Sequence, residues 1–338
     1  MVRAPPNDLQ PTPGIDTLNN PVGKLIRVFL ARCFKVQVNQ HPFEIDAELR
    51  AMRDSAITAT HHASLVAKCC LIESLSWFVI ADPGWSETNL LSPLRKENQQ
   101  ALALWKAAAW QPIYTNVLKI IGKEMVERAM DPRLRRETRD SLIRSLVVES
   151  LYALWEGRSP AVPHADIQQM LRSLDDEARA QAAGIVEQFT AALSPQDNQQ
   201  LDERFRRAAE PFLKQVWPQE RSLATPGVAA AFASLPRTCD TAFVDGVNAV
   251  ERFLVPFECW SMSQYGFYGE KDDERKLRLI DHPAKAKALL RLLDNTVGTA
   301  EGAVFPMDLG SALEKIRSVS PTLADESSFR RLAALTRR

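Results

Sequence analysis

The chain has 338 residues, of which 45% are hydrophobic and 25% are charged, as is ordinary for a folded protein. Lysine plus arginine and aspartate plus glutamate both number 42, so the chain lacks the basic excess typical of nucleic-acid-binding domains. Its five unpatterned cysteines do not form a disulfide framework, and no run of about 18 apolar residues predicts a membrane span. We therefore expect a cytoplasmic protein, with enough length for two domains or one repeat array.

Residues 1–20 predict a flexible lead-in. They contain four prolines in the first thirteen positions and no apolar signal-peptide core. The segment has the character of a linker, so we expect an ordered region upstream of it.

Helical periodicity dominates from about residue 21 onward. No stretch alternates β-branched and polar residues over five or more positions, so the sequence predicts an all-α fold. The clearest apolar stripes belong to three expected helices: Ile113, Val117, Ile120, Ile121 and Met125; Leu142, Ile143, Leu146, Val147, Leu151, Leu154 and Trp155; and Leu171, Leu174, Ala178, Ala182, Ile185, Phe189 and Leu193.

Polar residues followed by proline mark possible helix starts, because proline is favoured at the first helical position. With Thr12-Pro13 and Asp82-Pro83 set aside, the pairs are Ser92-Pro93, Asp131-Pro132, Ser159-Pro160, Ser194-Pro195, Thr225-Pro226, His282-Pro283 and Ser320-Pro321. Most gaps are about 30 to 40 residues, which suits a helix-turn-helix repeat. The spacing predicts an irregular HEAT- or armadillo-like α-solenoid; a compact helical domain is the alternative.

Composition changes near Arg221 and predicts two subregions, residues 21–220 and 221–338. Upstream, the expected helices are long and charged on one face. Downstream, shorter helices are expected at about 226–235, 240–254 and 283–297, with Gly298 as a stop for the last.

His61, His62, Cys69 and Cys70 are zinc-ligand types within ten residues. The stretch "HHASLVAKCCLIESLSWFVI", residues 61–80, predicts a single helix, on which His62 and Cys69 lie about 10.5 Å apart along the axis. One zinc ion does not bridge that separation. We therefore expect core cysteines and no metal site.

Catalytic and cofactor motifs are missing from the sequence. There is no nucleophile elbow, P-loop, HExxH or dinucleotide-binding glycine pattern. Gly298, Gly302 and Gly310 follow no expected strand, so an interhelical loop is favoured over an anion site. We expect no cofactor; an enzyme with an unrecognised site in a helical cleft stays open.

The densest basic runs, "RLRRETRDSLIR" and "RFRRAAEPFLK", are interleaved with acidic residues. Such interleaving is typical of a solvated helix face with i,i+4 ion pairs. Binding to phosphates favours a stripe of one sign. A HEAT-like nucleic-acid binder is therefore the alternative function.

Residues 255–270, "VPFECWSMSQYGFYGE", gather aromatic residues and two glycines in an otherwise helical chain. We expect an aromatic plug between the two subregions, with Trp260 buried. Tyr265 and Tyr268 are expected to be partly exposed and free to contact a partner. Glu258 is expected to be desolvated and paired with Arg252 or Arg221. The candidate partner-contact residues are therefore Glu258, Trp260, Tyr265 and Tyr268.

Three stretches, "WPQERSLATPG", "FLVPFECWSMSQYGFYGE" and "NTVGTAEGAVFPMDLGSALEKI", resemble the C-terminal region of large bacterial multidomain proteins of unknown function. Some of these carry a sirtuin-like or nucleotide-handling N-terminal domain and are suspected of phage defence. The resemblance covers roughly the last 120 residues and carries over no functional residue. It implies a helical sensor or scaffold whose enzymatic partner domain is not in this chain.

These observations together favour a non-enzymatic helical region. We expect it to recognise a protein partner or to regulate a linked or adjacent effector domain.

Overall fold

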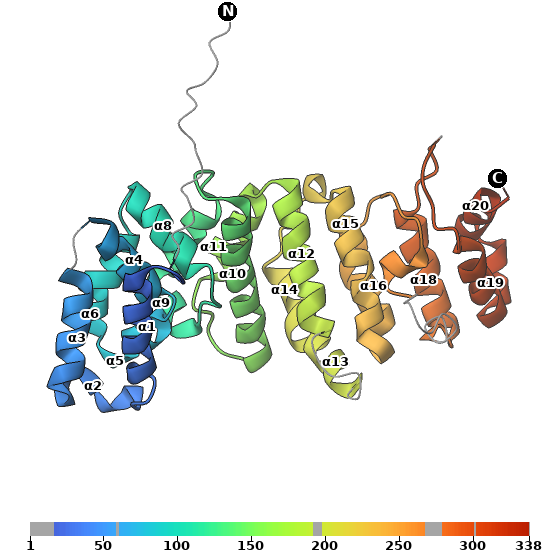
Figure 1. The fold of residues 1–338 in the computed structure, drawn as a ribbon. Helices are drawn as coiled ribbons and strands as arrows, with labels where there is room; N and C mark the ends of the chain where they lie inside the picture. The colour runs from blue at the N-terminus through green and yellow to red at the C-terminus, as the bar shows by residue number, and fades with distance from the viewer. Residues whose placement is uncertain (1–16, 59–60, 192–197, 268–278, 301, 338) are drawn as a thin grey trace, which may run out of the picture. The chain divides into compact units, whose positions relative to one another are not determined.

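The computed structural model describes residues 17–58, 61–191, 198–267, 279–300 and 302–337. Every regular element in these ranges is helical and none is a strand, so the predicted all-α fold is confirmed there (Figure 1). The chain divides into two compact units, residues 1–145 and 146–338. The helix α10 (Arg136–Glu156) contains this boundary. The composition change at Arg221 lies inside the second unit, so a domain division there stays a prediction.

The first unit consists of short helices followed by the first half of α10. They are α1 (Pro21–Cys33), η1 (Val38–Gln40), α2 (Pro42–Ile45), α3 (Ala47–Thr58), α4 (His61–Ile72), α5 (Leu75–Ala81), α6 (Pro83–Ser86), η2 (Glu87–Leu91), α7 (Ser92–Leu94), α8 (Gln99–Ala108) and α9 (Thr115–Ala129). Helix α4 packs against both α1 and α8. The expected helices around Ile121 and Leu146 correspond to α9 and α10.

An aromatic core in the first unit encloses one arginine. Phe43 and Phe78 stack with ring centroids 6.2 Å apart. The guanidinium of Arg53 lies over Phe43 at 4.5 Å and over Trp85 at 4.7 Å, and it donates to Asp82 at 2.5 Å. Asp82 also accepts the backbone N–H of Trp85 and caps α6. The buried cation is thus both paired and stacked, which offsets its loss of hydration.

A second ionic cluster joins the end of α9 to the loop before α8. Asp131 accepts from Arg128 at 2.8 Å and from Arg133 at 2.7 Å. Arg133 and Arg128 both bind Glu97 as well. The Arg133 side chain, its backbone N–H and Arg128 together lower the pKa of Asp131 to about 2, against the opposing effect of burial.

The second unit contains the remaining helices. They are α11 (His164–Ser173), α12 (Asp176–Ala191), α13 (Asn198–Arg204), η3 (Phe205–Ala209), α14 (Glu210–Gln215), η4 (Arg221–Leu223), α15 (Pro226–Ala233), η5 (Leu235–Ala242), α16 (Phe243–Val250), η6 (Glu251–Phe253), η7 (Met262–Tyr265), α18 (Pro283–Thr296), α19 (Leu309–Val319), η9 (Pro321–Asp325) and α20 (Ser327–Leu335). Within this unit α12 packs on α15, α15 on α18, and α18 on α19 and α20 (Figure 1).

The helix expected from Leu171 to Leu193 is wrong as a single element, because the chain breaks between α11 and α12. Leu174 has extended backbone angles, and the Asp175 carboxylate accepts the N–H of Ala178 at 2.8 Å to begin α12. Arg179 then donates to the carbonyls of Leu171, Arg172 and Leu174. Asp175 therefore satisfies a free N–H group at the start of α12, and Arg179 satisfies free carbonyl groups at the end of α11.

Proline pairs mark helix starts in only some of the predicted places. Thr225-Pro226 begins α15, and His282 caps α18 by accepting the N–H of Ala284. Ser92-Pro93 instead lies in a continuous helical run, and neither Asp131-Pro132 nor Ser159-Pro160 begins a helix. Ser320-Pro321 begins only the 3-10 turn η9. Ser194-Pro195 lies outside the described residues, whereas the pair set aside, Asp82-Pro83, does begin α6.

The segment from His61 to Cys70 belongs to one helix, α4, as predicted. The single helix expected over residues 61–80 is wrong, because α4 ends at Ile72 and α5 begins at Leu75 after a bend of 84°. Cys69 and Cys70 are buried, and burial raises the pKa of their thiols to about 12 and about 11. Among the described residues, no three His, Cys, Asp or Glu side chains are grouped as a metal ion requires. The lack of zinc binding stays a prediction.

No single helix in the described part of the chain is both long and apolar enough to cross a membrane. One bent pair, His62–Ile72 with Leu75–Ala81 at 84°, has the length and composition.

Candidate functional site: an exposed tip with a fixed backbone

The candidate site is formed by two segments of the second unit. The first connects η6 to η7 and continues to Phe267; the second follows α18 and leads into α19. The N–H of Phe257 donates to the carbonyl of Thr296 at 3.1 Å, and the N–H of Met307 donates to the carbonyl of Trp260 at 3.1 Å. The two segments are therefore joined at both places by backbone hydrogen bonds. We call the surface formed by Pro256, Glu258, Trp260 and Met307 the tip.

The side chains of Asp308 and Gln264 fix the backbone of the tip by hydrogen bonds. Asp308 accepts the N–H of Met262 at 2.8 Å and the hydroxyl of Ser261 at 3.3 Å. The amide oxygen of Gln264 accepts the N–H of Trp260 at 2.8 Å. These bonds fix the turn that carries Trp260 on both of its sides.

Gly266 ends this turn in a conformation that suits glycine. Its φ is +74°, in the left-handed region. A Cβ there would lie 2.3 Å from Cδ of Arg237, so a larger residue would also clash. The glycine thus allows the chain to return to the core directly after η7.

The inner face of the segment is an aromatic anchor. Tyr265 is 0% exposed, and its hydroxyl is 2.7 Å from the hydroxyl of Thr296 in α18. Its ring lies 5.7 Å from that of Phe257, while Phe267 packs 5.9 Å from Phe243 of α16. Burial raises the pKa of the Tyr265 phenol well above its usual range, so the hydroxyl stays neutral. The anchor fastens the tip to α16 and α18.

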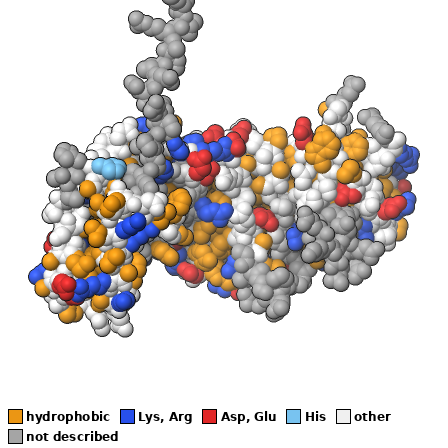
Figure 2. Space-filling model, in the orientation of Figure 1, with side chains coloured by type: hydrophobic (Ala, Val, Ile, Leu, Met, Phe, Trp, Pro, Cys, Tyr) orange, Lys and Arg blue, Asp and Glu red, His pale blue; other side chains and the backbone are white. Residues whose placement is uncertain are grey.

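The outer face leaves large apolar side chains in solvent. Trp260 is 64% exposed and Met307 is 86% exposed, and Pro256 and Glu258 are exposed beside them. Figure 2 shows hydrophobic side chains gathered on this face of the second unit, in the region of α15 and α18. Tryptophan is enriched at the centres of protein interfaces, and methionine adapts to irregular partner surfaces. The tip can therefore bind an apolar patch without rearranging its backbone.

The structure corrects three expectations for this segment. Trp260, expected to be buried, is the exposed residue, and Tyr265, expected to be partly exposed, is fully buried. Glu258, expected to be desolvated, is exposed. Its expected partners make other bonds: Arg221 donates to the carbonyl of Arg252, and Arg252 donates to that of Gln219 at 2.7 Å. Tyr268 lies outside the described residues.

Another aromatic group connects the two sides of residue 221. Trp217, fully buried, lies 4.8 Å from Phe232 and 6.4 Å from Phe253, measured between ring centroids. Trp217 and its neighbours therefore pack across residue 221, and the plug predicted from a buried Trp260 is wrong. The sequence pattern missed Trp217 because it stands apart from the aromatic-rich stretch.

The chemistry of the tip suits contact better than catalysis. Its one thiol, Cys259, is buried, and desolvation raises its pKa to about 11, so the nucleophilic thiolate is disfavoured. Met307 and Asp308 were missed as members of the site. Met307 lies 47 positions along the chain from Trp260, and Asp308 lies 46 positions from Met262, so only the fold brings them together.

Comparison with protein-family models, characterised proteins and solved structures finds no match for this chain.

Proposed function

We propose that this chain is a non-enzymatic helical recognition protein that binds a protein partner through the tip. The observation that carries the proposal is the exposure of Trp260 on a backbone held by fixed hydrogen bonds. Because the backbone that carries Trp260 is already fixed, binding costs little backbone conformational entropy, so more of the contact energy of Trp260 appears as affinity.

A HEAT-like stacking of the helices fits this role. The sequential packing of α12, α15 and α18 in the second unit supports it. In such arrays each helix pair contacts its neighbours and leaves an extended surface for partners. The resemblance to bacterial multidomain proteins supports a partner that is an effector domain, linked or adjacent, in phage defence.

Nucleic-acid binding is less favoured. Several cations of the two basic runs are neutralised within the chain: Arg136 by Asp140, Arg207 by Glu203, and Lys214 by Glu210. All three pairs are i,i+4 contacts of the kind that the interleaved sequence predicts. Phosphate binding would have to break such pairs or use other cations.

The decisive experiment is a comparison of Trp260→Ala with Trp110→Ala. Trp110 is 75% exposed in the first unit, so it controls for loss of an exposed tryptophan. Proteins retained by the immobilised wild-type chain from extracts of its own cells are identified and purified, and their dissociation constants are measured. We expect Trp260→Ala to weaken binding about 30-fold, as at an interface hot spot, and Trp110→Ala to leave it unchanged.

The free energy of unfolding of both variants is expected to lie within about 0.5 kcal/mol of the wild-type value, because truncating an exposed side chain removes few packed contacts. Equal affinity of wild type and Trp260→Ala for every purified partner would refute the proposal. Salt-sensitive binding of duplex DNA or RNA with no protein partner would favour the alternative function.

A further inference from the structure

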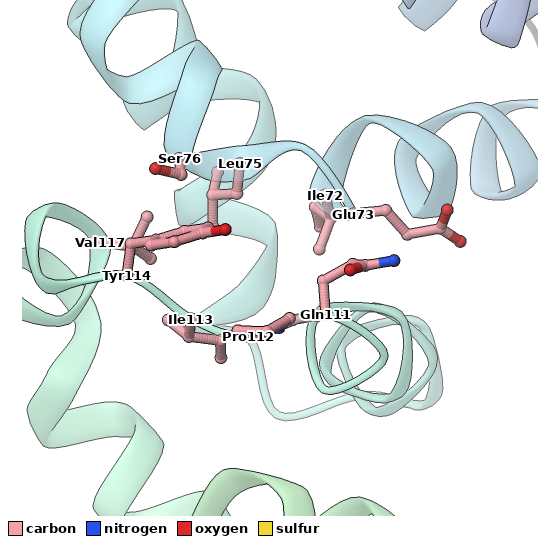
Figure 3. A pocket seen from close by; sticks show the side chains of 10 residues that line it. Ile72, Glu73, Leu75, Ser76, Gln111, Pro112, Ile113, Tyr114 and Val117 are labelled. Carbon is pink, nitrogen blue, oxygen red and sulfur yellow. The ribbon is translucent and has the colours of Figure 1, made fainter. Parts of the chain in front are cut away.

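A small pocket lies in the first unit, between the turn joining α4 to α5 and the loop joining α8 to α9 (Figure 3). Ile72, Leu75 and Val117 form its buried walls, and Ile113 closes it from the loop. The ring of Tyr114 is seen edge-on in Figure 3, so one of its faces borders the open space. The pocket is therefore mainly apolar, with an aromatic face along it.

One end of the pocket is polar. Glu73 and Gln111 extend near each other at the right-hand end in Figure 3, with the carboxylate and the amide group at their tips. The hydroxyl of Ser76 is already bonded to Asn116, at 3.1 Å. The Ser76 oxygen can still accept, but Figure 3 shows it on the opposite side of the pocket, so the side-chain acceptors at this end are the oxygens of Glu73 and Gln111.

Glu73 carries a charge that the described part of the chain does not pair. No Lys, Arg or His of those residues lies within ion-pair distance of it, although Arg27 is near enough to favour its ionised form. Half-burial opposes ionisation more strongly and raises the pKa of Glu73. The positive charge of an added cation at this end of the pocket would offset the cost of that desolvation.

The size of the space limits the ligand. About 30 Å³ is open to water-sized molecules, enough for about two waters and far below a cofactor site. The end of one side chain fits, whereas a nucleotide or an aromatic ring does not. The planar guanidinium of arginine is wider than the compact ammonium of lysine.

We propose that this pocket receives a lysine side chain of a protein partner. The aliphatic stem lies against Ile113 and the Tyr114 ring, and the ammonium group donates to the Glu73 carboxylate and the Gln111 amide oxygen. Apolar walls with an acidic end complement this amphipathic side chain. The site differs from the tip in unit and in chemistry, so it goes beyond the proposed function.

The test uses short alanine-rich peptides that differ at one central position, which is lysine, arginine, norleucine or glutamate. Norleucine keeps the aliphatic stem of lysine and removes the charge. Binding is followed by NMR through the methyl groups of Ile72 and Ile113 in the full chain. We expect the lysine peptide to bind about ten-fold more tightly than the norleucine peptide, as is usual for a charge-assisted hydrogen bond.

Three variants locate the effect. Glu73→Gln is expected to weaken lysine-peptide binding about ten-fold and leave norleucine unchanged. Glu127→Gln, which removes an exposed carboxylate of α9 outside the pocket, is the matched control and is expected to change neither. Arg27→Gln removes the nearby competing cation and is expected to strengthen lysine binding. Equal binding of lysine and norleucine peptides, arginine bound more tightly than lysine, or an unchanged affinity in Glu73→Gln would overturn the proposal.

Discussion

Asp131 is a buried carboxylate whose stabilising contribution depends on pH. In the folded chain its pKa is about 2, because Arg133 and Arg128 donate to it. In the unfolded chain it is about 4. The folded state therefore binds the proton less readily, so the stabilisation is complete above about pH 4 and is lost as the pH falls toward about 2.

We expect Asp131→Asn to lower the free energy of unfolding by about 2 kcal/mol at neutral pH. The difference from wild type is expected to shrink between about pH 4 and pH 2, because the wild-type carboxylate then becomes protonated as well. Denaturant titrations at several pH values measure it. Asp54→Asn, at a half-exposed carboxylate beside Arg53, serves as the control and is expected to lose about 1 kcal/mol or less. A difference for Asp131→Asn that persists at pH 2 would argue against this account.

At the same scale, the sequence drew attention to the segment that contains Glu258 and Trp260 but predicted the burial of Trp260 and Tyr265 the wrong way round. The aromatic residues between Phe257 and Phe267 all favour burial by composition, and nothing local separates Trp260 from Tyr265. What separates them is a tertiary contact. The Tyr265 hydroxyl finds a partner in Thr296, which lies in α18, while Asp308 fixes the turn so that Trp260 faces solvent. Neither contact has a sequence signal.

Among the elements, the junction of α11 and α12 depends on Arg179. Its guanidinium donates to carbonyls at the end of α11 and binds Asp176 at 2.7 Å, and its side chain is 3% exposed. Truncating the Arg179 side chain leaves buried carbonyl groups without a hydrogen-bond donor, which lowers the stability of the folded state because water does not reach these groups.

We expect Arg179→Ala to lower the free energy of unfolding by about 2 to 4 kcal/mol. The matched variant Asp176→Ala removes the exposed partner and keeps the bonds to the carbonyls, so it is expected to lose about 1 kcal/mol or less. Urea titrations of both variants give the comparison. Equal losses would mean that the ion pair, and not the helix end, is what Arg179 stabilises.

This junction also shows that apolar periodicity does not predict where one helix ends and the next begins. The stripe from Leu171 to Phe189 keeps its helical spacing across the break, and these side chains are buried on both sides of it. A single Asp175 side chain begins the second helix. The proline pairs fail as predictors of helix starts in a similar way. Asp82-Pro83 begins α6, because the Asp82 carboxylate accepts the N–H of Trp85 in the first turn. The Asp131 carboxylate instead accepts from the Arg133 N–H and from the Arg128 side chain, and no helix begins there. The same dipeptide thus begins a helix or a turn according to its tertiary partners.

For the whole molecule, the all-α class follows from the sequence, since helical periodicity recurs throughout and strand patterns are missing. The positions of the two compact units do not follow from the sequence. Their boundary falls inside α10, where neither a linker nor a composition change marks it. The boundary lies where the side chains of α10 stop packing on the first unit and start packing on the second. Ser141, in the first half of α10, donates to the carbonyl of Ala109 at 2.5 Å, and Tyr152, in the second half, packs 5.1 Å from Phe189.

If each unit has its own core, each should unfold separately although they share α10. Trp105 is fully buried in the first unit and donates to the carbonyl of Leu94 at 2.9 Å; Trp217 is fully buried in the second. Replacing either by alanine is expected to destabilise its own unit by about 3 to 5 kcal/mol. Hydrogen exchange at low denaturant, read peptide by peptide, separates the two responses.

We expect Trp105→Ala to speed exchange in residues 17–58 and 61–145 and to leave residues 160–191 and 198–267 unchanged, with the reverse pattern for Trp217→Ala. Within α10, the half around Ser141 should follow Trp105 and the half around Tyr152 should follow Trp217, because those halves pack on different cores. Equal acceleration along the whole chain in either variant would show instead that α10 couples the two cores into one cooperative unit. In that case a sequence change at either core would alter the stability of the tip and of the pocket together.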